Sequence, residues 1–306
     1  MAIPTSRTSE RGEICIDQIR CNGCGRCVEV CKDFNFRISA GKAEITSNPL
    51  FGCVACGHCM AICPTDAIKI CGRELSADDL FILPAKETNA TYEQLLALLQ
   101  KRRSIREFAD KPVEREIIQK ILAAASTAPM GIPPSDVHLM ILDSPGKVRK
   151  FSEDFCNFLL SLKWLVSGWF LAVMRPVWGK TIDQMMREFV KPIIRVYTES
   201  MTRRIDLVTY DAPLAIYFYG SPYTDPADPL IAATYAMIAG ESLGLGTCMI
   251  GGIHPFIQYG GKAKQLREKY GIKFKSREGL FVIFGYPKVK YLKGIRRTFA
   301  SVDIRN

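Results

Sequence analysis

The chain has 306 residues, of which 48% are hydrophobic and 24% charged; these ordinary proportions exclude a disordered or collagen-like chain, and the length favours two domains. The formal net charge is +10, from 41 lysines and arginines against 31 acidic residues, which invites a nucleic-acid or anionic-membrane interpretation. We discount that interpretation because the basic residues are scattered and no nucleic-acid motif is visible.

Cysteines dominate the first quarter of the chain. Ten of the 12 cysteines lie between Cys15 and Cys71. The opening residues MAIPTSRTSE contain no apolar segment of a secretory signal, so we expect a cytoplasmic protein with reduced cysteines. Thiols crowded in this way in a reducing compartment indicate metal binding.

Eight of these cysteines form two copies of one pattern, Cys-x2-Cys-x2-Cys-x3-Cys, offset by 32 residues. The copies are Cys21, Cys24, Cys27 and Cys31, then Cys53, Cys56, Cys59 and Cys63. The spacing is that of the bacterial ferredoxin run, in which the fourth cysteine binds the other cluster. We therefore expect one [4Fe-4S] cluster on the first three cysteines of run one with Cys63, and a second on those of run two with Cys31.

Two zinc sites are the alternative, but zinc closes with two Cys-x2-Cys pairs and has no use for a triple run. The first run lacks the proline that follows Cys63, so its exit geometry is expected to differ. Cys15 and Cys71 lie outside both runs and are expected to be ordinary buried thiols. Residues 12–71 resemble the two-cluster bacterial ferredoxins, and the resemblance implies low-potential one-electron transfer.

Short apolar segments, ICIDQI and AIKIC, flank the two runs, and a turn is expected at 40–42, so this domain should contain a small sheet. Residues 72–90 are mixed, polar and without period, which predicts a linker. A helix begins after Thr91, because Thr91 and Gln94 form a capping box.

Further elements alternate along the second domain, 91–306. Helices are expected at 114–126, 229–243 and 262–270, and buried strands at 137–142, 214–219 and 280–285. This order predicts an α/β or α+β layer structure with helices packed on a central sheet.

Residues 158–178 form the most apolar stretch of the chain. Lys163, Arg175 and Pro176 interrupt it, leaving less than the roughly 18 apolar residues of a membrane span. We favour a buried or dimer-interface helix; a lid over a substrate pocket and an interfacial membrane contact are the alternatives. The wider insert, 155–204, has no assigned role.

Three further motifs suit a phosphate-bearing cofactor. KRRSIREF at 101–108 supplies arginine forks and a hydroxyl, although basic clusters at helix ends also complement the helix dipole. AGESLGLGTCMIGG at 239–252 supplies glycines where the backbone approaches a flat group or turns. FGYPKVKYLKGIRR at 284–297 adds a terminal arginine pair.

The order of these motifs resembles the nitroreductase family over residues 91–306. The resemblance implies an α+β fold with a central, mainly antiparallel sheet, and a homodimer with FMN at the interface. It also implies FMN contacts from Arg102, Arg103, Ser104, Arg106, Ile250, Gly251, Gly252, Arg296 and Arg297. At 128–137 the chain departs from the family's asparagine-containing stretch, so backbone of Pro129, Met130 or Gly131 is expected to contact the flavin instead.

No general acid, base or nucleophile stands out. His58, His138 and His254 are expected to be structural or solvated, and His254 is the one to test. The leading hypothesis is an enzyme that passes electrons from an external low-potential donor through the clusters to FMN and on to a small electron-poor acceptor. A non-catalytic electron-transfer or redox-sensing protein is the alternative; reversed electron flow and use of NAD(P)H stay open.

Overall fold

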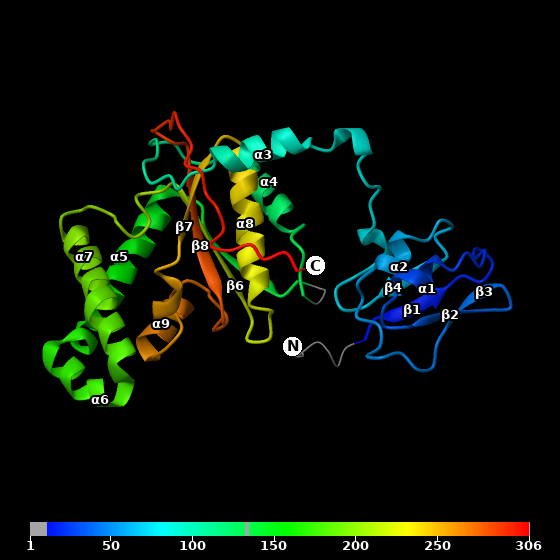
Figure 1. Cartoon of the computed structure of the whole chain (residues 1–306), viewed down its shortest axis with the longest axis horizontal. Coiled ribbons are helices and arrows are strands. Elements are labelled where there is room, and N and C mark those ends of the chain that lie inside the picture. The colour runs from blue at the N-terminus through cyan, green and yellow to red at the C-terminus, as the bar shows by residue number, and fades with distance from the viewer. Residues whose placement is uncertain (1–10, 132–134, 306) are drawn as a thin grey trace.

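A computed structural model describes residues 11–131 and 135–305, which form two lobes joined by an extended connection (Figure 1). The small N-terminal lobe contains two two-stranded antiparallel sheets, and the larger lobe contains a four-stranded sheet covered by helices. The predicted α+β class is confirmed.

The N-terminal lobe is built from short elements around the cysteines. Strand β1 (Glu13–Ile16) pairs antiparallel with β4 (Ile68–Cys71), and β2 (Phe36–Ser39) pairs with β3 (Lys42–Ile45). The turn predicted at 40–42 joins β2 to β3. Each cysteine run leads into a short helix, α1 (Arg26–Val30) or α2 (His58–Ala61).

Cys15 and Cys71 are exposed, so the prediction that they are ordinary buried thiols was wrong. In the β1–β4 pair, Cys15 stands opposite Lys69 and Cys71 opposite Glu13. Side chains alternate between the two faces of a strand, and the inward face of β4 is taken by Ile68 and Ile70. Both cysteines therefore fall on the outer face.

Between the lobes, residues 72–90 contain two single-turn 3-10 helices, η1 (Ala77–Asp79) and η2 (Lys86–Thr88). Helix α3 (Tyr92–Lys101) follows, and its capping box is confirmed: the Gln94 N–H donates to the Thr91 hydroxyl at 3.3 Å and the Thr91 N–H donates to Gln94 Oε1 at 3.0 Å. All ten residues of α3 are at least partly exposed.

The central sheet of the larger lobe has the order β5-β6-β8-β7, and all its neighbouring strands are antiparallel. The strands are β5 (Val137–Leu142), β6 (Leu214–Gly220), β7 (Gly246–Ile250) and β8 (Gly279–Gly285). Three of them agree with the predicted ranges to within one residue. The fourth, β7, was expected only as a glycine-rich element.

Helices cover both faces of this sheet (Figure 1). Helices α4 (Arg115–Ala125) and α8 (Ala227–Ser242) pack on the face formed by Leu214, Ile216 and Phe218 of β6. Helix α5 (Pro145–Ser161) packs on the opposite face, and α7 (Lys191–Thr202) and α9 (Gly261–Lys269) pack against α5 in the same core. The predicted helices at 114–126, 229–243 and 262–270 are confirmed with small shifts.

The apolar stretch 158–178 is not one buried helix, so that part of the favoured prediction was wrong, whereas a role in a dimer interface stays a prediction. It is divided among the end of α5, the 3-10 turn η3 (Lys163–Val166) and α6 (Gly168–Met185). A π-helical turn, η4 (Met186–Val190), then leads into α7. Within the described ranges, no helix is both long and apolar enough to cross a membrane.

Candidate cluster and flavin sites

The first hollow in the N-terminal lobe is lined by Cys21, Cys24, Cys27 and Cys63. The first three belong to the first run and Cys63 ends the second. Antiparallel pairing of β1 with β4 brings the two runs together. The fourth cysteine of the second run therefore lies beside the first run.

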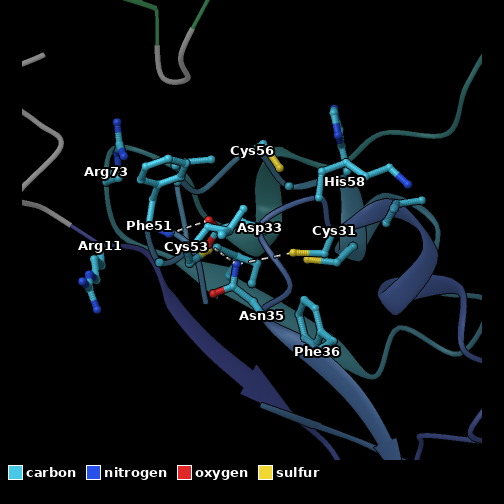
Figure 2. Close-up of a pocket in the computed structure, with 18 of the residues that line it drawn as sticks. Arg11, Cys31, Asp33, Asn35, Phe36, Phe51, Cys53, Cys56, His58 and Arg73 are labelled. Carbon is cyan, nitrogen blue, oxygen red and sulfur yellow. Dashed lines mark hydrogen bonds between the residues drawn. The ribbon is translucent and has the colours of Figure 1, made fainter. Parts of the chain in front are cut away.

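The second cavity, about 740 Å³, is lined by Cys31, Cys53, Cys56 and Cys59. Figure 2 shows Cys31 facing the loop that carries Cys53 and Cys56. The cavity extends past the sulfur atoms to Phe51, so it is larger than the space between the four cysteines. The crossed grouping thus has the arrangement expected from the repeat.

All twelve cysteines are free thiols. Burial raises the pKa of Cys27, and burial together with the charges of Cys53, Cys56 and Cys31 raises the pKa of Cys59 to about 12. Desolvation opposes the thiolate form of Cys27 and Cys59, and a bound cation would compensate for it. An all-sulfur donor set of this kind fits a [4Fe-4S] cluster. In the described part of the chain, no three His, Cys, Asp or Glu side chains converge on the position of a single ion.

Hydrogen bonds reach three of the sulfurs. The Ala43 N–H donates to Cys21 Sγ at 3.4 Å, the Ala67 N–H to Cys63 Sγ at 3.3 Å, and the Asn35 amide to Cys31 Sγ at 3.4 Å. Burial raises the pKa of Cys63, but hydrogen bonds from Thr65 and Ala67 outweigh it, and the net shift is downward. Such bonds stabilise a coordinating sulfur and tune its cluster. Asn35 carries no sequence signal and was not predicted.

The first cysteine loop depends on Gly23. Its φ is +71°, and a Cβ there would stand 1.9 Å from the carbonyl oxygen of Gly41. We expect Gly23→Ala to displace the loop and to remove the iron of the first hollow, about half of the total. Iron analysis of protein purified without oxygen measures this loss.

Gly25 provides a matched control. Its φ is +76°, but a Cβ there would meet no atom within 4 Å. Gly25→Ala therefore adds only backbone strain of about 1 to 2 kcal/mol and is expected to keep its iron. Equal iron loss in both variants would contradict a role for the close approach to Gly41.

In the larger lobe, backbone hydrogen bonds bring together the three motifs at 101–108, 239–252 and 284–297 that were predicted to bind a phosphate-bearing cofactor. The Ile105 N–H donates to Thr247 O at 3.0 Å, at the start of β7, and the Ala109 N–H donates to Tyr286 O at 2.7 Å, just past β8. The basic segment 101–108 is thereby held beside both glycine-containing motifs. Both contacts join backbone atoms, so no sequence motif predicts them.

Two arginines of that segment lie near a half-buried acid, Glu241. Burial raises the pKa of Glu241, and the guanidinium groups of Arg102 and Arg103 partly oppose the shift. Arg106 lies over the ring of Tyr210, with 5.5 Å between the guanidinium carbon and the ring centroid. A Cβ on Gly294 would stand 2.8 Å from Arg103 Nη2. The exposed tail that carries Arg296 and Arg297 therefore passes beside Arg103.

Gly251 and Gly252 follow the end of β7. A Cβ on Gly251 would meet nothing within 4 Å, and one on Gly252 would meet only the Tyr197 hydroxyl at 3.6 Å. Open space against exposed backbone is what a flat ring system requires. Because β7 runs from the arginine segment to this glycine pair, the residues predicted to contact the FMN phosphate and those predicted to contact its ring lie near the two ends of β7.

The structure does not bring Pro129, Met130 and Gly131 to this platform. The Gly131 N–H donates to Asp228 Oδ1 at 3.0 Å, at the start of α8. This stretch leads to β5, whereas Gly251 follows β7, and β5 and β7 are opposite edges of the sheet. Residues 132–134 of the same predicted stretch lie outside the described residues.

The three histidines differ in environment. His58 is exposed, and His138 Nε2 lies 3.4 Å from Asp136 Oδ1. His254 is buried, its Nδ1 is 2.8 Å from the Tyr217 hydroxyl, and burial lowers its pKa. His254 therefore anchors the turn after the glycine pair in its neutral form.

A neutral buried histidine makes stability depend on pH. The pKa of folded His254 is lowered from 6.5, so below pH 6.5 the unfolded chain binds a proton that the folded chain does not. We expect stability to fall as pH falls below 6.5, and His254→Gln to weaken this dependence. Thermal unfolding of both proteins on either side of that pH tests it; an unchanged pH dependence in the variant would contradict the assignment.

Residues 99–286 match the nitroreductase family, and residues 20–68 match the 4Fe-4S dicluster domain. The first match covers more than half of the chain, and the chain therefore belongs to the nitroreductase family. The predicted family, the N-terminal ferredoxin-type domain and the oxidoreductase class are confirmed.

Two solved structures share the fold of the larger lobe. A nitroreductase with bound FMN from Bacteroides fragilis has a TM-score of 0.53 and 18% identity, and the match covers 70% of this chain and 99% of that one. A nitroreductase with bound FMN from Desulfitobacterium hafniense has a TM-score of 0.50 and 18% identity, covering 69% and 98%. A comparison with curated proteins gives no match.

Proposed function

We propose that this chain is an iron-sulfur flavoprotein oxidoreductase that receives electrons from an external low-potential donor through two [4Fe-4S] clusters, collects them on FMN and reduces a small electron-poor acceptor of nitroaromatic, quinone or enone type. The observation that carries the proposal is the pair of four-cysteine hollows in the same chain as a nitroreductase fold.

The chain's own residues divide the work between two domains, 12–71 and 91–306, with 72–90 as the linker. Arg102, Arg103 and Ser104 bind the FMN phosphate and ribityl chain, with Arg297 closing from the tail. The backbone of Gly251 and Gly252 supports the ring. Bound FMN supplies the exchange between one-electron and two-electron chemistry, and the protein sets position, access and charge.

A homodimer completes this site. Within one chain, Gly131 lies in the stretch that leads to the edge strand β5, whereas Gly251 follows β7, and these two strands are three strand spacings or about 14 Å apart. The predicted contacts from Pro129 to Gly131 therefore serve the flavin of a second copy. Exposed Leu95 and Leu99 on α3, 45% and 44% accessible, add an apolar face for the same contact.

The covalent link between the lobes supports electron exchange between the clusters and the flavin. A tethered one-electron carrier reaches the flavin at high effective concentration, an advantage that is lost if NAD(P)H alone supplies hydride. The free cysteines fit a reducing compartment such as the cytoplasm.

Single-turnover mixing tests the function. Protein reduced with dithionite without oxygen is mixed with a nitroaromatic, a quinone or an enone, and flavin reoxidation is followed by absorbance. We expect a rate that saturates with at least one acceptor class. A linear dependence on every acceptor would favour the non-catalytic electron carrier or redox sensor, and rapid flavin reduction by NAD(P)H would overturn the cluster route.

A further inference from the structure

The insert presents a broad apolar surface, here called the insert surface. It consists of side chains of η3, α6 and η4 that are between 43% and 74% exposed: Trp164, Trp169, Val173, Val177, Ile182, Met185 and Phe189. Trp169, Val173 and Val177 are spaced by four residues and share one helix face. Apolar exposure of this extent marks an interaction site.

Contacts between aromatic rings hold the side chains of this surface in place. Phe170 contacts Trp164, Trp169 and Trp178, with ring centroids 5.0, 5.6 and 5.7 Å apart. The chain has three tryptophans, and all of them lie in this cluster. Tryptophan is the side chain that prefers the boundary between water and hydrocarbon.

Cations line a groove of the same insert. A groove of about 560 Å³ between the end of α5, η3 and α7 is lined by Lys163, Lys191 and Arg195, above apolar Val166 and Ile194. In the described part of the chain, none of these three cations forms a salt bridge within 4.0 Å. Glu199 is the single acidic residue among those that line the groove.

The one buried acid of the insert is already neutralised. Asp183 is 7% exposed, and its carboxylate lies 2.9 Å from Arg187 Nε and 3.9 Å from Arg175 Nε. The free charge of the region is therefore mainly positive, next to apolar and aromatic side chains. This combination matches the headgroup and upper acyl layer of an anionic bilayer.

We propose that the insert surface docks this oxidoreductase onto a membrane rich in anionic phospholipid. Docking is peripheral, because Pro176 lies within α6 and Gly179 breaks its helical geometry with a φ of +75°. Helix α6 and the ferredoxin-type lobe lie at opposite ends of the molecule (Figure 1). A membrane at α6 therefore leaves the cysteine cavities accessible to a donor from solution.

Charge complementarity distinguishes the membrane from a second copy. A twofold contact through the insert surface brings two copies of the cations Lys163, Lys191 and Arg195 to one interface, and this accumulation of like charge is unfavourable. Anionic headgroups meet the same cations with opposite charge. The proposed flavin dimer also uses other parts of the fold, namely α3 and the stretch that ends at Gly131.

Vesicle co-sedimentation tests the proposal with the cofactor-loaded chain. We expect binding to vesicles of phosphatidylcholine with phosphatidylglycerol, weak binding to phosphatidylcholine alone, and release by salt. Replacing Lys163, Lys191 and Arg195 together by glutamine lowers the partition coefficient about 100-fold. Trp169→Ser with Val177→Ser lowers it at least about tenfold.

Ile82→Ser with Lys120→Gln is a control for location, since it removes one exposed apolar side chain and one cation outside the insert surface. It is expected to bind as the unchanged protein does. Tryptophan emission should shift to the blue with anionic vesicles. Absence of vesicle binding, equal binding to neutral vesicles, or equal loss in the control would overturn the proposal. So would a dimer that becomes a monomer in the Trp169 variant by light scattering, because a second copy would then cover the surface. Flavin and iron contents are measured in parallel, and they test the proposed function separately.

Discussion

Cys31→Ala is expected to remove the cluster of the second cavity, although Cys31 belongs to the first cysteine run. Cys31 lines the cavity of Cys53, Cys56 and Cys59, and its charge contributes to the raised pKa of Cys59. A [4Fe-4S] cluster with three protein thiolates is labile, so iron should fall by about half, from roughly eight atoms per chain to roughly four. Iron analysis without oxygen measures this loss.

Double variants identify which cluster is lost. Cys31→Ala with Cys56→Ala affects one cavity twice and is expected to retain about half of the iron. Cys31→Ala with Cys24→Ala affects both cavities and is expected to retain almost none. The opposite pattern, with the Cys31 and Cys56 pair losing all iron, would mean that each run holds its own cluster.

Replacing Arg102 and Arg103 together by glutamine is expected to abolish flavin retention. Each guanidinium supplies charge-assisted hydrogen bonds worth about 1.5 to 3 kcal/mol, so the double variant should bind FMN about 100-fold more weakly or worse. The half-buried Glu241 beside them would also lose its compensating charges. Flavin-to-protein ratios and fluorescence titration of the flavin-free protein measure the change.

Lys120→Gln and Arg115→Gln on α4 are the controls, because they remove the same number of positive charges outside the segment 101–108. These controls should retain FMN. Iron content should be unchanged in all of these variants, since the cysteine cavities lie in the other lobe. If the double variant of Arg102 and Arg103 kept its flavin, the FMN phosphate would have to be bound by other residues.

Local patterns made much of this protein predictable. The cysteine spacing gave the crossed grouping because a short loop can present three thiols to one hollow, while the residue three positions further on faces away. Thr91 and Gln94 located the start of α3 because both partners of the capping box are close in sequence. The buried strands 137–142, 214–219 and 280–285 were visible as short apolar runs between breakers.

Features that depend on tertiary context were not predictable. Cys15 and Cys71 were predicted to be buried because cysteine is a small apolar residue. Side chains alternate between the two faces of a strand, however, and isoleucines occupy the inner face of β4. The apolar stretch 158–178 suggested burial, yet Trp169 is 66% exposed because, among the described residues, none covers that face of α6. The contacts of Asn35 with Cys31 and of Glu241 with Arg102 and Arg103 form only in the folded chain, and no sequence motif marks them. The placement of Pro129 to Gly131 away from Gly251 follows from strand order, which local sequence does not encode.

Anaerobic analysis of iron, sulfide, zinc and flavin in the purified chain tests the central claim most directly. Two cubanes on eight cysteines and a flavin in the nitroreductase fold predict about eight irons, about as much labile sulfide, and FMN near one per chain, with a brown colour that bleaches with dithionite. Zinc in place of iron, or a colourless protein without flavin, would contradict the account.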